Sequence, residues 1–208
     1  SQTGVFESDE LVARHLESAH GYRRELGSRD SHTAELALRA ARCYLSAARR
    51  ALDRDALVSA GAQAARGAAL ATADRPLQAE LLLVGCEAYL SAGDVAAGAA
   101  LVEELDRVAD ETLAPWATCY RCQYLVYTDP SRLPEIEDRL QEAIDEFARR
   151  ADAGGSAKAY RVRASVRGRL GRIGDCEADL FEALIAARHG GDHRQITAAL
   201  GAAPSAAL

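Results

Sequence analysis

The 208-residue sequence has few residues that favour β-strands and no long apolar run. Aromatic residues make up 5% of it, and no run of Val, Ile or Thr alternates with polar residues over more than a few positions. Alanine, leucine, arginine and glutamate are abundant instead, and all four lose little side-chain freedom in a helix. No apolar stretch approaches the roughly 20 residues that cross a bilayer. The composition therefore predicts an all-α protein without a membrane partner.

The sequence also has no excess of basic residues. Lys and Arg number 25 against 31 Asp and Glu, so the net charge is -6. A positive field over the whole surface, which supports non-specific binding to nucleic acids, is therefore absent. We expect no direct nucleic-acid partner.

The first residues, Ser1-Gln2-Thr3-Gly4, lack the basic segment and apolar stretch of a signal peptide. They also lack an initiator Met, which predicts an excised region of a longer protein. The cysteines are odd in number and lie within helical patterns, which is typical of reduced thiols rather than of a disulfide framework. We therefore expect a cytoplasmic protein with five reduced cysteines: Cys43, Cys86, Cys119, Cys122 and Cys176.

Helical periodicity and helix breakers divide the chain into hairpins. A leading helix over 8–26, capped by Ser8 or Asp9, ends at Gly27. Gly154-Gly155-Ser156 is predicted to be a loop between helices. Short turns between helices of about fifteen residues make the helices antiparallel neighbours. Four hairpins and the truncated start of a further unit follow the leading helix, at 31–71, 77–109, 113–150, 157–188 and 190–208.

Two segments carry a matching pattern of small and packing residues. Residues 79–105 place Leu82, Cys86, Tyr89, Gly93-Asp94, Gly98, Val102 and Leu105 in the order of a tetratricopeptide repeat. Residues 157–184 repeat that order with Tyr160, Ala164, Gly171, Cys176, Leu180 and Ala183. Arg163 and Arg167 stand at positions that are usually apolar, which predicts a tilted or partly packed unit.

Weaker matches extend the array. Residues 115–148 fit loosely and residues 34–48 fit in one helix only. The small residues at which paired helices cross, Ala41, Cys86, Cys122 and Ala164, are 45, 36 and 42 positions apart. The consensus repeat has about 34 residues, so the chain resembles a degenerate tetratricopeptide-like array. The predicted fold is all-α: a right-handed superhelix of antiparallel helical hairpins with about eight helices, in a single domain over 1–208.

The style of the array resembles the C-terminal sensor regions of large actinobacterial signalling ATPases and transcriptional regulators. The phrases Gly174-Asp175-Cys176-Glu177-Ala178 and Gly191-Asp192-His193-Arg194-Gln195 carry this resemblance. It implies a regulatory or sensor fragment of a larger signalling protein.

In such arrays the first helix of each hairpin lines a concave groove. Carried onto this sequence, the groove runs from an acidic or mixed end to a basic end, which suits an acidic peptide or partner helix. A plainer interpretation is that the basic residues form a solvated face and that Trp116 fills a gap between hairpins. The candidate groove residues are Arg42, Glu80, Glu87, Trp116, Gln123, Tyr127, Lys158, Arg161 and Arg169.

Other candidate chemistry lacks its necessary partners. Cys119 and Cys122 lie within a helix without a second ligand pair for zinc, and His189 and His193 straddle a Gly-Gly turn. The sequence contains neither a phosphate-binding loop nor a Gly-x-Ser-x-Gly elbow. We therefore expect no catalytic residue, no metal, no cofactor and no enzymatic activity.

The leading hypothesis is a non-catalytic protein- or peptide-binding repeat module that acts as a regulatory scaffold. The alternative is a small-molecule effector domain with its ligand near Trp116, Tyr127 and Arg161. The Ala/Leu faces of the terminal segments, 5–26 or 190–208, also predict self-association.

Overall fold

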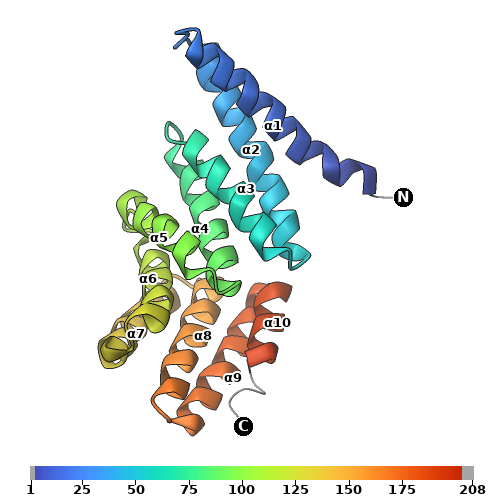
Figure 1. The fold of residues 1–208 in the computed structure, drawn as a ribbon. Helices are drawn as coiled ribbons and strands as arrows, with labels where there is room; N and C mark the ends of the chain where they lie inside the picture. Colours follow the sequence, from blue (N-terminus) through green and yellow to red (C-terminus); the bar gives the residue numbers. More distant parts are fainter. Residues whose placement is uncertain (1–2, 203–208) are drawn as a thin grey trace. The chain divides into compact units, whose positions relative to one another are not determined.

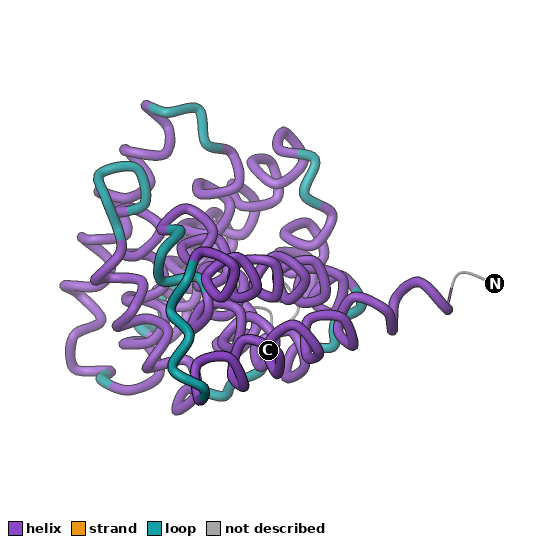
Figure 2. Tube along the Cα trace, turned by 90° about the horizontal axis from the view of Figure 1, so that it is seen from above, coloured by secondary structure: helices purple, strands orange, loops and turns teal. Residues whose placement is uncertain are grey.

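A computed structural model describes residues 3–202, and the side chains of residues 9–201. These residues form ten α-helices and one short 3₁₀ turn, with no strand among them (Figures 1 and 2). The all-α prediction is confirmed. The prediction of about eight helices is approximate: the structure has the predicted leading helix, the eight helices of the four hairpins and a further helix over 193–202. The part of the predicted terminal unit at 203–208 lies outside the described residues.

Contacts divide the chain into two compact units, Ser1–Val108 and Ala109–Leu208. The division falls between the second and third predicted hairpins. The first unit holds α1 (Thr3–Glu25), α2 (Ser31–Asp53), α3 (Leu57–Leu70), α4 (Arg75–Ser91) and α5 (Val95–Val108). The second holds α6 (Ala114–Thr128), η1 (Pro130–Arg132), α7 (Leu133–Arg149), α8 (Ala153–Arg169), α9 (Ile173–Gly190) and α10 (His193–Ala202).

Within each unit every helix packs on the next one in the chain, as antiparallel neighbours (Figure 1). Alternate helices also touch, α2 with α4 and α6 with α8. This is the pattern of a hairpin array, in which the first helices of consecutive hairpins form one layer. None of the described helices combines the length and apolarity that crossing a membrane requires.

Aspartate caps and left-handed glycines set the turns. The Asp94 carboxylate accepts a hydrogen bond from the Ala97 backbone N–H at 3.0 Å, directly after Gly93 has turned the chain with φ 75°. Gly171 does the same after α8 with φ 74°. Only glycine adopts this conformation without a steric penalty. The predicted turns at Gly93-Asp94 and Gly171 are confirmed.

Two predicted boundaries are wrong. Helix α1 begins at Thr3, so Ser8 and Asp9 are not its cap. Helix α8 begins at Ala153 rather than 157, because the Asp152 carboxylate caps it by accepting from the Gly155 N–H at 2.8 Å. Gly154 and Gly155 therefore lie in the helix instead of in a loop. A Cβ on Gly155 would stand 2.2 Å from the Phe147 ring, so glycine here permits close packing of α7 and α8.

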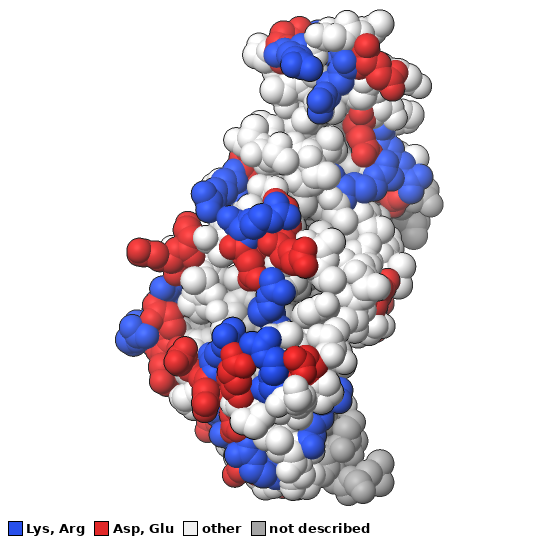
Figure 3. Space-filling view, turned by 60° about the vertical axis from the view of Figure 1, so that its left-hand side comes forward, with Lys and Arg blue, Asp and Glu red and all other residues white. Residues whose placement is uncertain are grey.

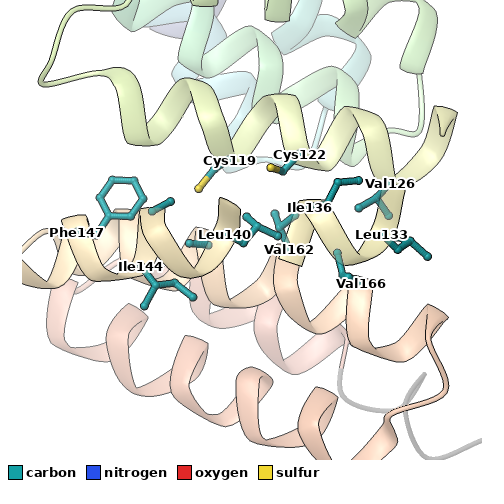
Figure 4. Packing of buried hydrophobic residues seen from close by; sticks show 12 residues of the cluster. Cys119, Cys122, Val126, Leu133, Ile136, Leu140, Ile144, Phe147, Val162 and Val166 are labelled. Carbon is teal, nitrogen blue, oxygen red and sulfur yellow. The ribbon is translucent and has the colours of Figure 1, made fainter. Parts of the chain in front are cut away.

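The core is built on the predicted small residues. The small residues at the predicted helix crossings are all buried: Ala41, Cys86, Cys122 and Ala164. In the second unit an apolar cluster forms between α6, α7 and α8, and Figure 4 shows the Cys119 and Cys122 sulfurs directed into it together with Ile136 and Leu140. Small residues let helices approach closely, so many modest contacts replace a few large anchors.

Candidate functional site

In the first unit, the candidate groove residues lie where α2 packs on α4. The exposed Arg42 guanidinium is 3.7 Å from the Asp74 carboxylate. The exposed Glu80 carboxylate pairs with Arg49 at 2.8 Å. Glu87 is buried and accepts a hydrogen bond from the Ser91 hydroxyl at 3.3 Å. Arg42 and Glu80 are thus exposed to solvent, and each forms an ion pair within the first unit. Glu87, by contrast, is buried.

Trp116 on α6 is a packing residue. Its indole N–H donates to the Asp152 carboxylate at 3.0 Å, and its ring lies edge-on to Phe147 with centroids 5.4 Å apart. Asp152 is also the cap of α8, so one carboxylate links the indole of α6 to the start of α8. This placement supports the interpretation of Trp116 as a side chain that fills a gap between hairpins.

Lys158 on α8 is completely buried. Its ammonium donates to the Gln123 side-chain oxygen at 2.6 Å and lies 4.5 Å from the centre of the Tyr120 ring. A buried ammonium needs such partners because desolvation of a charge is costly. Sequence reasoning placed Lys158 and Gln123 on the groove surface, whereas in the structure both side chains are internal.

Tyr127 and Arg169 are exposed, and Arg161 is half-buried. Tyr127 is 46% exposed, and the exposed Arg169 guanidinium lies 5.5 Å from the centre of its ring. Arg161 is half-buried one turn after Lys158, and the exposed Ser165 donates its hydroxyl hydrogen to the Arg161 carbonyl at 3.3 Å. We call Tyr127, Arg161, Ser165 and Arg169 the cationic face of α6 and α8.

Charge is segregated between the helices of the second unit. Helices α6 and α8 contain six cationic residues and no carboxylate side chain. Helices α7 and α9 contain ten carboxylates and three arginines. On the side of the molecule shown in Figure 3, by contrast, groups of both signs are interspersed. The first helices of the hairpins in this unit therefore offer an anion the more favourable local field.

Arg163 and Arg167 do not loosen the last hairpin, contrary to the sequence-based expectation. Arg163 is 6% exposed and forms a bidentate pair with Asp179, with N–O distances of 2.6 and 2.9 Å. Arg167 reaches the same carboxylate at 3.1 Å and Glu137 at 2.9 Å. The polar positions are therefore packed, because α9 and α7 supply the matching acids.

Hydrogen bonding also sets the charge of Glu137. Burial alone would raise the pKa of Glu137, but hydrogen bonds from Arg172 and Arg167 outweigh it and lower that pKa. Sequence reasoning missed Glu137, Asp179 and Asp152. Of these, only Asp152 carried a local signal, as a capping aspartate before a helix.

The cysteines and histidines considered as metal ligands do not belong to a metal-binding cluster among the described residues. Burial raises the pKa of the Cys119 thiol, so the thiolate that metals and oxidants require is disfavoured. All five cysteines are free thiols. Within residues 3–202 no cluster of three or more His, Cys, Asp or Glu side chains is arranged to hold a metal ion.

A surface hollow of about 250 Å³ lies between α7, α8 and α9. Phe147, Asp152, Tyr160, Glu182 and His189 are among its lining residues. Burial, and then the nearby Glu182 charge, raise the pKa of Tyr160.

Comparison of the sequence with protein-family models and with curated proteins gives no match.

Proposed function

We propose that the chain is a non-catalytic binding module that takes an acidic protein segment on the cationic face of α6 and α8. The observation that supports it best is the exposed pair of Arg169 and Tyr127, on two helices without a carboxylate side chain. A regulatory or sensor role within a larger signalling protein, of the actinobacterial kind that the sequence resembles, is part of this proposal.

Arg169 differs from Arg163 and Arg167, on the same helix, in its partners. Arg163 and Arg167 are bound to acids of those helices. Arg169 lies over the Tyr127 ring and has no carboxylate partner among the described residues. A ligand carboxylate can therefore form a bidentate pair with it, while the tyrosine supplies an apolar surface beside the charge.

The small-molecule alternative has less support. Trp116, one of the residues expected near the ligand, is engaged by Asp152 and Phe147. The hollow beside Tyr160 and Glu182 is open, and its carboxylates favour a cation instead of the acidic ligand that α8 favours.

Fluorescence anisotropy with a labelled decaglutamate peptide tests the proposal. We expect binding that weakens with salt, because the contacts are ionic. Arg169→Ala should weaken it about tenfold, since a hydrogen-bonded charge pair is lost. Tyr127→Ala should weaken it less, through lost apolar contact.

Arg188→Ala is the matched control, because Arg188 is an exposed arginine on the acidic helix α9. It removes the same charge from the same unit away from the proposed face. Equal losses for Arg169→Ala and Arg188→Ala would mean unspecific charge attraction and would refute the site. Equal binding of a decalysine peptide would refute the ligand class.

A further inference from the structure

Helix α1 contacts the rest of the first unit through many polar side chains, three of them carboxylates, and buries few apolar ones. Among its side chains at 9–25, only Ala13 is fully buried, and Leu11 and Val12 are exposed. Helix α2, by contrast, buries an apolar stripe that extends from Leu36 to Leu52. Burial of an apolar face, which stabilises most helices in proteins, is therefore small for α1. Polar contacts contribute a larger share of the free energy that holds α1 in place.

Three carboxylates of α1 each meet donors on α2 or α3. Asp9 accepts from Arg50 at 2.5 Å and from the Ser46 hydroxyl at 3.1 Å. Glu10 accepts from the Gln63 amide at 2.9 Å. Glu17 accepts from the Tyr44 hydroxyl at 2.6 Å and from Arg66. We call the donor set the α1 seat: Tyr44, Ser46, Arg50, Gln63 and Arg66.

The seat is specific for carboxylates spaced along a helix. Asp9 and Glu17 are eight residues apart, close to two turns, so both point to the same side of α1. Arg66 also lies 5.2 Å from the centre of the Tyr44 ring, which fixes the guanidinium beside the hydroxyl. An acidic amphipathic helix of this spacing can engage donors on two helices at once.

Helix α1 leaves one hydrogen-bonding position of the seat unused. Gln63 is 7% exposed, and its side-chain oxygen accepts no hydrogen bond within the described residues. A buried acceptor without a donor destabilises the occupied state. A helix that brings a donor to this point would satisfy the seat more fully than α1 does.

We propose that the α1 seat is a second binding surface, that its partner is an acidic amphipathic helix of another protein, and that α1 is the internal competitor. This surface belongs to the first unit and does not depend on the cationic face of α6 and α8. Residues 26–30 link α1 to α2. Such a short link gives α1 an effective concentration on the order of millimolar, so an external helix binds visibly only when α1 detaches.

The test uses the full chain and a fluorescein-labelled synthetic peptide with the sequence of residues 7–26. The wild-type chain should bind it weakly. The Glu17→Gln chain, in which α1 loses the negative charge that accepts from Tyr44 and Arg66, should bind the peptide about tenfold more tightly, because a larger fraction of chains has a vacant seat. Hydrogen exchange should show faster exchange in α1 and unchanged protection in α2.

Three controls separate the seat from general loosening. Glu25→Gln, on the same helix with an exposed carboxylate, should leave peptide binding at the wild-type level. Arg66→Gln weakens α1 and the seat together, so it should give no gain. The Asp9→Asn chain, which loses the Arg50 pair, should reproduce the gain if Glu17→Gln proves unstable. No binding to either loosened chain at millimolar peptide, or an equal gain for Arg66→Gln, would overturn the proposal.

Discussion

Removing Asp179 should destabilise the second unit strongly. Its carboxylate holds Arg163 through bonds of 2.6 and 2.9 Å and also meets Arg167 at 3.1 Å. The Arg163 and Asp179 side chains are only 7% and 3% exposed, so solvent cannot replace the lost partner. Breaking a buried pair on one side costs about 3–5 kcal/mol, and we expect Asp179→Ala to lie in that range.

Urea denaturation followed by tryptophan fluorescence measures this loss. The chain has one tryptophan, Trp116, and it packs in the core of the second unit, so the signal reports that unit. Arg139→Ala is the control, because Arg139 pairs with Glu135 on the surface of α7. It should change the free energy of unfolding by less than about 1 kcal/mol.

A double variant distinguishes a stabilising pair from a merely tolerated one. Replacing Arg163 with Met and Asp179 with Leu removes both charges and keeps much of the buried volume. Such apolar replacements are often neutral or stabilising, so the double variant should recover most of the loss from Asp179→Ala. A single-variant loss below about 1 kcal/mol, or a double variant less stable than the single one, would refute this reasoning.

Two further variants test packing and pH response. Gly155→Ala should cost about 1–3 kcal/mol in urea denaturation, because its Cβ would overlap the Phe147 ring, whereas Gly174→Ala meets open space and should be neutral or slightly stabilising. Equal effects of the two would contradict the proposed overlap. Burial and the hydrogen bond to Glu17 raise the pKa of Tyr44 above the ordinary value of about 10, so the neutral phenol is favoured in the folded state. The stability that Tyr44 contributes is therefore present below pH 10 and lost as pH rises beyond it, and Tyr44→Phe should reduce this alkaline loss in thermal unfolding followed by circular dichroism.

The sequence alone determined where most helices run and how they turn. Gly93-Asp94 and Gly171 act through local backbone chemistry, and Ala41, Cys86, Cys122 and Ala164 act through their size at helix crossings. These signals lie within a few residues of their effect, so periodicity and capping reveal them. The loop predicted at Gly154-Gly155 was wrong because Asp152 and Phe147 favour a helix there.

The tertiary structure decided which candidate residues can meet a ligand. Periodicity places Lys158, Gln123, Tyr127 and Arg169 on helix faces, but burial depends on what covers each face. Lys158 and Gln123 became internal partners, while Tyr127 and Arg169 stayed exposed. Arg163 pairs with the carboxylate of Asp179, which lies 16 residues away in the sequence. The Trp116 indole pairs with that of Asp152, which lies 36 residues away. Such pairings arise only when separate helices pack, because no local pattern in the sequence fixes which side chains will face each other across a crossing.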